Sequence, residues 1–271
     1  MGVLIKGWKD DSRDRLVWAV AGFAGYLDQW EDFEDAWRVL LDTYEIPYLH
    51  MTEFADPCGP YAKWHPTEEH YEEIAAFFAD VTRVIGRCGI QGFGAITRVA
   101  DLDRFNAERG LSLQPYPVAV YGSLISIYQR YPREPVELVF DHVEKIHSKL
   151  AAARDYADGD QHYAGDFDRM QMIPLNKSLT FRDIKPLQAA DFLVWEYRKN
   201  HVEREGWWAQ QGKPDDWDAR WHDFEAWMER EKPRTRKSIL ALLERTAFTG
   251  FIWDYAQLCE ADRMRGGRWS A

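Results

Sequence analysis

Residues 183–199, DIKPLQAADFLVWEYRK, contain one aspartate inside an otherwise apolar run. Pro186 is typical of the first turn of a helix and Asp183 of a helix cap, so this segment is predicted to be helical. Apolar side chains lie on every side of that helix, which predicts that it is buried. Asp191 therefore cannot easily reach water. A metal ion, a basic side chain, hydrogen bonds or its own protonation must compensate its burial, because an unpaired buried carboxylate is costly.

The composition is that of a globular protein able to bury a sizeable core. Of the 271 residues, 15% are aromatic, including 13 Trp, so large side chains must pack in a core or against a partner. The longest nearly apolar stretch, residues 16–27, is too short to cross a bilayer, and residues 1–15 lack the apolar segment of a signal peptide. We therefore expect no membrane association and a cytoplasmic location. Three cysteines without CxxC spacing indicate neither a disulfide framework nor a cysteine zinc site.

The net charge of −11 argues against a protein that coats nucleic acid through a basic surface. It does not exclude a nuclease, because enzymes that hold Mg²⁺ through carboxylates need acidic residues at the site. Two local basic stretches, PRTRK at 233–237 and RMRGGR at 263–268, are either solvated surface or contacts for phosphates.

Strand and helix patterns alternate along the chain in an order that mixes hairpin-like and crossover connections. This order predicts an α/β fold, with a mixed sheet and helices packed on its faces. Strands are expected at 16–23, 90–97 and from 135 to Asp141, and helices at 28–44 (with an Asp28 and Glu31 capping box), from Pro66 to 85, at 114–131 and at 183–199.

The C-terminal part of the chain is rich in charge and tryptophan. We expect one domain over residues 1–200 and a Trp-rich helical extension over 201–271 that packs on the same domain. Its residues 207–228 either pack an aromatic stripe on that domain or form the surface for a protein partner or a second copy of the chain.

Asp141 and Asp191 are the strongest candidates for a shared site. Val136, Leu138 and Phe140 face one way in the strand before Asp141, which places this aspartate at the carboxyl end of a core strand. Ligands bind outside the carboxyl ends of strands in sheets covered by helices. Converging carboxylates suit Mg²⁺ or Mn²⁺, although for each aspartate alone a structural cap or salt bridge is the alternative.

The segment LHMTEF adds His50 and Glu53, which are three residues apart and share a face if a helical turn begins here. Glu53 is a candidate third carboxylate, and His50 a candidate proton shuttle or ligand of phosphate or metal. His142 points to the opposite face if its strand continues, and is secondary. No complete GxGxxG, GxSxG or HExxH motif occurs, so no cofactor other than a metal is indicated.

Several of these pieces, in their order along the chain, resemble a bacterial family known as domain of unknown function 3800, placed among the ribonuclease H-like folds. The resemblance covers roughly residues 17–244 and rests on HMTEF, VFD and most specifically PLQAADFL. It implies a ribonuclease H-like sheet whose acidic residues bind divalent metal and cleave nucleic acid, in proteins associated with mobile or defence loci. By position, Asp141 and Asp191 are the implied strand and helix carboxylates.

One departure from that family concerns its first aspartate, the expected central metal ligand, which directly follows the first strand. Here that position reads Ile5-Lys6-Gly7, and a lysine places positive charge where a cation should bind. Asp10 or Asp11 fills the role only if the strand register or loop length is shifted, and we take Asp11 as the third candidate ligand.

Two functions follow from the sequence. The first is a nuclease or other phosphodiester hydrolase that uses Mg²⁺ or Mn²⁺, with Asp141, Asp191, Glu53, His50 and Asp11 at its site. The second is a catalytically degenerate ribonuclease H-like protein that acts as a binding or regulatory subunit. The missing first aspartate motivates the second function.

Overall fold

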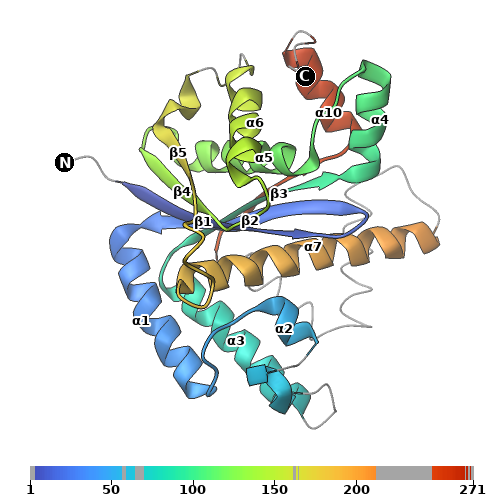
Figure 1. The fold of residues 1–271 in the computed structure, drawn as a ribbon. Helices are drawn as coiled ribbons and strands as arrows, with labels where there is room; N and C mark the ends of the chain where they lie inside the picture. Colours follow the sequence, from blue (N-terminus) through green and yellow to red (C-terminus); the bar gives the residue numbers. More distant parts are fainter. Residues whose placement is uncertain are drawn as a thin grey trace.

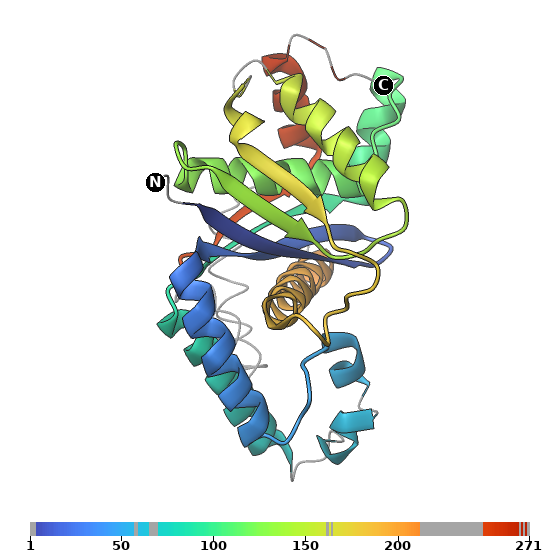
Figure 2. The same cartoon turned by 60° about the vertical axis from the view of Figure 1, so that its left-hand side comes forward.

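A six-stranded mixed sheet forms the centre of the protein, with helices on both faces (Figures 1 and 2). The computed structural model describes residues 4–56, 59–64, 70–160, 163, 165–211, 246–265, 267 and 269. The α/β class and the mixed sheet predicted from the sequence are confirmed. Among the described residues, no helix has the length and apolar character needed to cross a bilayer.

The strand order is β5-β4-β1-β2-β3-β6. The first three strands form an antiparallel meander, while β4 is parallel to β1, β5 is parallel to β4, and β6 is parallel to β3. The strands are β1 Ile5–Arg13, β2 Val17–Tyr26, β3 Gln91–Arg98, β4 Val136–Phe140, β5 Met170–Pro174 and β6 Thr249–Trp253.

Two helical layers cover the sheet. Helix α5 packs on one face with α6 against it, and α7 crosses the other face over β1 and β2, where α1 also contacts it (Figure 1). The helices are α1 Leu27–Thr43, α2 Met51–Ala55, α3 Tyr71–Arg87, α4 Val99–Arg109, α5 Pro115–Arg130, α6 Ile146–Asp158, α7 Lys185–Gln211 and α10 Tyr255–Met264, with 3₁₀ turns η1 Gly59–Trp64 and η3 Asp166–Arg169.

The sheet separates two hydrophobic cores because successive side chains of a strand point to opposite faces. In β4 the predicted alternation is confirmed: Val136, Leu138 and Phe140 belong to the core on the α5 side. Val139 packs against Leu187 of α7 on the other side. The residue that follows β4 is Asp141, so its place at the carboxyl end of a core strand is also confirmed.

Strand β1 is longer than the sequence suggested and continues through Asp10 to Arg13. Its Lys9 is completely buried, and its Nζ donates to the carbonyl oxygen of Phe93 in β3 over 2.9 Å. Gly22 of β2 lies between them in the ladder, and a Cβ there would be 1.9 Å from the Trp8 carbonyl oxygen. Close backbone approach thus fixes the register of β1 and the position of Asp10.

Two of the predicted helix starts are wrong in detail. Helix α1 begins at Leu27, where the Tyr26 N–H donates to Gln29 Oε1 at 2.8 Å, and the expected Asp28 cap is not its cap. Helix α7 begins at Lys185, and the Asp183 carboxylate instead accepts hydrogen bonds from Thr180. Pro66, the expected start of another helix, lies outside the described residues.

The expected boundary at residue 200 falls inside α7, which runs unbroken to Gln211. The part beyond it is not wholly helical, because residues 249–253 pair with β3 as β6; their sequence, TGFIW, is rich in β-branched and aromatic residues. Residues 212–245 lie outside the described residues and include most of the Trp-rich segment and the basic stretch 233–237. The partner surface at 207–228 stays a prediction.

Candidate active site at the carboxyl ends of β1 and β4

Asp10 and Asp141 lie side by side where the parallel pairing of β1 with β4 ends. The last residue pair of the β1–β4 ladder is Lys9 with Phe140, and the Asp141 N–H donates to the Lys9 carbonyl oxygen at 2.9 Å. Matched residues of neighbouring strands point to the same face of a sheet. Trp8, two residues before Asp10, packs on the α7 side, so both aspartates belong to the face that α7 covers.

Asp191 comes to the same place from the second turn of α7. It is 7% exposed, and its Oδ2 accepts a 2.6 Å hydrogen bond from the Met51 N–H at the start of α2. One turn earlier, Leu187 packs on Val139 of β4, which sets the helix over the strand ends. The predicted burial of Asp191 is confirmed, and a backbone hydrogen bond provides part of its compensation.

The three carboxylates interact electrostatically. Burial, followed by the charges of Asp191 and Asp141, raises the pKa of Asp10 well above its usual range. Burial also raises the pKa of Asp141, against a hydrogen bond from the His142 N–H. The pKa of Asp191 rises to about 6, mainly through burial and despite the Met51 hydrogen bond. Burial and the mutual repulsion of like charges thus favour the protonated forms of these acids.

His50 lies beside this centre. Its positive charge, when protonated, lowers the pKa of both Asp141 and Asp191. The imidazole stacks on the Phe181 ring with a centroid separation of 4.1 Å, and its Nδ1 lies 3.3 Å from Glu53 Oε1, without the angle of a directed hydrogen bond. The predicted proximity of His50 and Glu53 is confirmed, because both lie at the start of the short helix α2.

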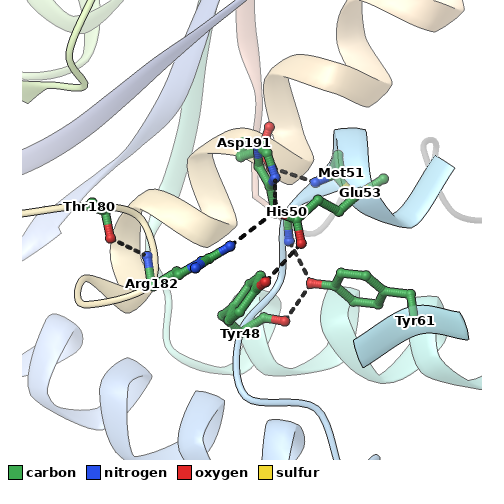
Figure 3. A network of polar contacts seen from close by, with 8 residues as sticks. All are labelled: Tyr48, His50, Met51, Glu53, Tyr61, Thr180, Arg182 and Asp191. Atoms are coloured by element: carbon green, nitrogen blue, oxygen red, sulfur yellow. Dashed lines mark hydrogen bonds and ion pairs between the residues drawn. The ribbon is translucent and has the colours of Figure 1, made fainter. Parts of the chain in front are cut away.

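The Glu53 carboxylate contacts Tyr48, His50 and Arg182. Tyr48 Oη donates to Glu53 Oε2 at 2.8 Å, and Arg182 Nη2 lies 3.4 Å from Oε1 (Figure 3). Burial opposes ionisation of Glu53, but the hydrogen bond from Tyr48, together with the neighbouring His50 and Arg182, lowers its pKa. Glu53 thus contacts His50 and Arg182, and its role as a third carboxylate of a metal site stays a prediction.

Arg182 is a site residue that the sequence did not single out. It comes from the loop before α7, and its guanidinium lies 4.7 Å from the Tyr48 ring centroid and 5.7 Å from that of Phe181. Its side chain is 57% exposed. Figure 3 shows Arg182 and Glu53 converging from different segments of the chain. Only the stacking of an arginine on two aromatic rings, which requires the fold, distinguishes it from other surface arginines.

Gln188 attaches the segment that carries His50 to α7. Its Oε1 accepts hydrogen bonds from Trp37 Nε1 at 2.9 Å and from the Leu49 N–H at 3.0 Å. Its Nε2 donates to the Phe181 carbonyl oxygen at 2.9 Å. One buried amide thus fixes three parts of the chain around the site.

Gln188→Leu is expected to destabilise the protein by about 3 kcal/mol, because it leaves buried donors at Trp37 and Leu49 without an acceptor. Urea unfolding monitored by circular dichroism measures the change. Gln257→Leu, on an exposed position of α10, is the control and is expected to stay within about 0.5 kcal/mol of the wild type. Equal stabilities of the two variants would contradict the role assigned to Gln188.

Asp11 does not share the face of the other aspartates. Alternation along β1 turns it toward α6, where burial raises its pKa to about 6 while Lys149 and Arg13 lower it. Asp10 takes the place expected for Asp11 because β1 continues past Ile5 through Asp10 and stays paired with β2 in register. Lys6 lies earlier in β1 and forms an ion pair with Glu137 at 3.3 Å, so it does not occupy the position of the first aspartate.

In the part of the chain that the structure describes, no three His, Cys, Asp or Glu side chains already point at one common position as metal ligands. The three aspartates influence one another through their charges. Comparison of the chain with protein-family models and with curated proteins gives no match.

Proposed function

We propose that the protein is a phosphodiester hydrolase, most simply a nuclease, that uses Mg²⁺ or Mn²⁺. The observation that carries this proposal is the convergence of Asp10, Asp141 and Asp191 from two adjacent parallel strands and a buried helix. Asp191 is buried, the other two are partly buried, and all three have a raised pKa. A divalent cation would favour the charged form of all three.

The donor set fits these metals. Asp10, Asp141 and Asp191 offer only oxygen, which hard cations prefer, and three carboxylates leave coordination positions for water and a phosphate oxygen. Asp10, Asp141 and Asp191 would hold such a cation, which would supply charge stabilisation and an activated water for phosphodiester hydrolysis. The chain supplies His50, whose ring is held by Phe181 and Glu53 beside Asp141 and Asp191, as the group able to move a proton.

The sheet topology supports a ribonuclease H-like fold. An antiparallel meander of β1, β2 and β3, extended on the β1 side by the parallel strands β4 and β5, is the arrangement of such domains. Together with the resemblance to domain of unknown function 3800, this arrangement supports the proposal that the protein belongs to that family.

The alternative, a degenerate binding subunit, was motivated by the missing aspartate after the first strand. The position of Asp10 on β1 beside Asp141 instead supports the hydrolase proposal. A binding role through residues 207–228 gains no support from the described residues.

Titration calorimetry of Mn²⁺ tests the proposed site. The wild type and Asp11→Asn are expected to bind Mn²⁺, whereas Asp10→Asn is expected to lose binding because it removes one of three ligands. Circular dichroism checks that each variant is folded. Loss of binding in Asp11→Asn with retention in Asp10→Asn would reverse the assignment, and absence of binding in the wild type, with and without an oligonucleotide, would reject it.

A further inference from the structure

Two basic side chains flank the indole of Trp18 on the sheet face opposite α7. The Arg13 guanidinium lies 4.8 Å from the Trp18 ring centroid, and the Lys149 Nζ of α6 lies 5.3 Å from it. Lys149 is also 5.1 Å from the Tyr116 ring centroid. We call Arg13, Trp18 and Lys149 the cationic ledge.

The ledge is built into the fold. Arg13 is the direct partner of Trp18 across the β1–β2 ladder, and Trp18 packs edge-on against Tyr116 of α5 at 5.9 Å. The tip of the same hairpin is held from the other face by Arg198 of α7. Its Nε donates to Ser12 Oγ at 2.8 Å, and its Nη1 contacts Asp14 Oδ2 at 3.0 Å. The two cations are therefore presented at a fixed place.

That place is the edge of the sheet at which the proposed active site lies. Arg13 follows Asp10 by three residues on the same strand, and Asp11 between them faces the charges of Arg13 and Lys149. Arg182 lies on the α7 side of this edge, since it contacts Glu53 and Tyr48. Basic side chains thus lie on both sides of the carboxylates.

The positive charge of the ledge is opposite in sign to that of the chain as a whole. The chain has a net charge of −11, which repels a polyanion at long range. Arg13 is exposed and Lys149 partly exposed; Asp11 is their acidic neighbour, but within the described part of the chain neither cation lies at ion-pair distance from a carboxylate. Cations that stack on an aromatic ring keep their charge and their outward N–H donors available for phosphate oxygens.

We propose that the cationic ledge binds the phosphodiester backbone of a nucleic-acid strand next to the position of cleavage. This inference rests on the proposed function and adds to it where the substrate lies: the strand crosses the sheet edge from the Arg182 side to the α6 side, over Asp10 and Asp141. The ledge meets phosphates rather than bases, so its contribution to affinity is independent of sequence and sensitive to salt.

Salt-dependent binding measures this contribution. Fluorescence anisotropy follows short labelled single-stranded DNA and RNA in an Asp10→Asn background, in which the strand is not cut. Arg13→Gln and Lys149→Gln are each expected to weaken binding several-fold. Each is also expected to reduce the slope of log affinity against log salt by about 0.7 for every phosphate that the variant no longer neutralises.

Lys63→Gln is the control, because Lys63 Nζ likewise lies over a tryptophan, 5.2 Å from the Trp64 ring centroid, but in the 3₁₀ turn η1 on the other face of the sheet, where it pairs with Glu45. Its affinity and salt slope are expected to equal those of the background protein. Thermal unfolding confirms that Trp18 remains packed in the two ledge variants.

Salt slopes that do not change in Arg13→Gln and Lys149→Gln would overturn the ledge, as would failure of the background protein to bind either nucleic acid. The proposed function has separate readouts, namely Mn²⁺ binding and cleavage by the wild type. Cleavage with unaltered slopes would reject only the ledge. Slopes that change as expected in a protein that neither binds Mn²⁺ nor cleaves would support the ledge and reject the hydrolase.

Discussion

Asp10→Asn is expected to lower the rate of Mn²⁺-dependent phosphodiester cleavage by at least about 10³-fold. A bound cation contributes several kcal/mol of charge stabilisation in such reactions, and each 1.36 kcal/mol corresponds to a factor of ten. Asp10 is the residue whose pKa is raised by the charges of both other aspartates. Single-turnover cleavage of a labelled oligonucleotide measures the rate.

Glu196→Gln provides the matched control for removal of an acid with a raised pKa. Glu196 lies on α7, is 3% exposed, and has a pKa raised to about 7 by burial, but its charged neighbours are Lys199 and Glu203 rather than the site aspartates. Cleavage by this variant is expected to match the wild type. If both variants cleave equally slowly, loss of a buried acid lowers activity by disturbing the fold and not by removing a metal ligand. A fully active Asp10→Asn would reject the three-aspartate site.

The second large effect concerns stability. Burial raises the pKa of Asp191 from 3.8 to about 6, so the folded protein holds this proton more tightly than the unfolded chain. The stabilisation from the protonated group is complete below pH 3.8 and is lost as the pH rises through about 6. Above that pH, ionised Asp191 costs about 3 kcal/mol in the absence of a cation.

Asp191→Asn is therefore expected to be more stable than the metal-free wild type at about pH 8, by up to about 3 kcal/mol, and similar to it near about pH 4. The asparagine oxygen still accepts the Met51 hydrogen bond but carries no charge. Urea unfolding in the presence of a chelator at both pH values measures the difference.

The same unfolding experiment with added Mn²⁺ tests whether Asp191 is a metal ligand or only a buried charged group. The wild type and Glu196→Gln are expected to gain stability from Mn²⁺, because a ligand that binds only the folded state stabilises it. Asp191→Asn is expected to gain much less. A metal-free Asp191→Asn that is less stable than the wild type at about pH 8 would show that the folded protein already compensates this charge.

The sequence predicted the parts of the site that local patterns determine. The period-two alternation before Asp141 and the apolar surroundings of Asp191 placed these residues correctly, because burial follows directly from spacing in a strand and in a helix. The α/β class followed from the order of such segments.

The features that the sequence did not predict, namely the full length of β1 and the contacts of Glu53, depend on tertiary contacts. The run from Ile5 to Arg13 contains four charged residues before Ser12, so its strand propensity is weak. Pairing with β2 and β4 on both sides makes it a central strand nevertheless, and this pairing selects Asp10 over Asp11. Glu53 was placed near His50 correctly, but its engagement by Arg182 depends on a loop that is distant in the chain.

The parallel pairing of β1 with β4 also has a consequence for how the protein folds. Asp10 and Asp141 become neighbours only when segments far apart in the chain meet, and Asp191 arrives later still during synthesis. Contacts of this kind carry a high entropic cost of loop closure and form slowly. A nascent chain or a fragment that ends before α7 lacks one of the three acids, so metal-linked protection from unfolding would report that the whole polypeptide has reached its native topology.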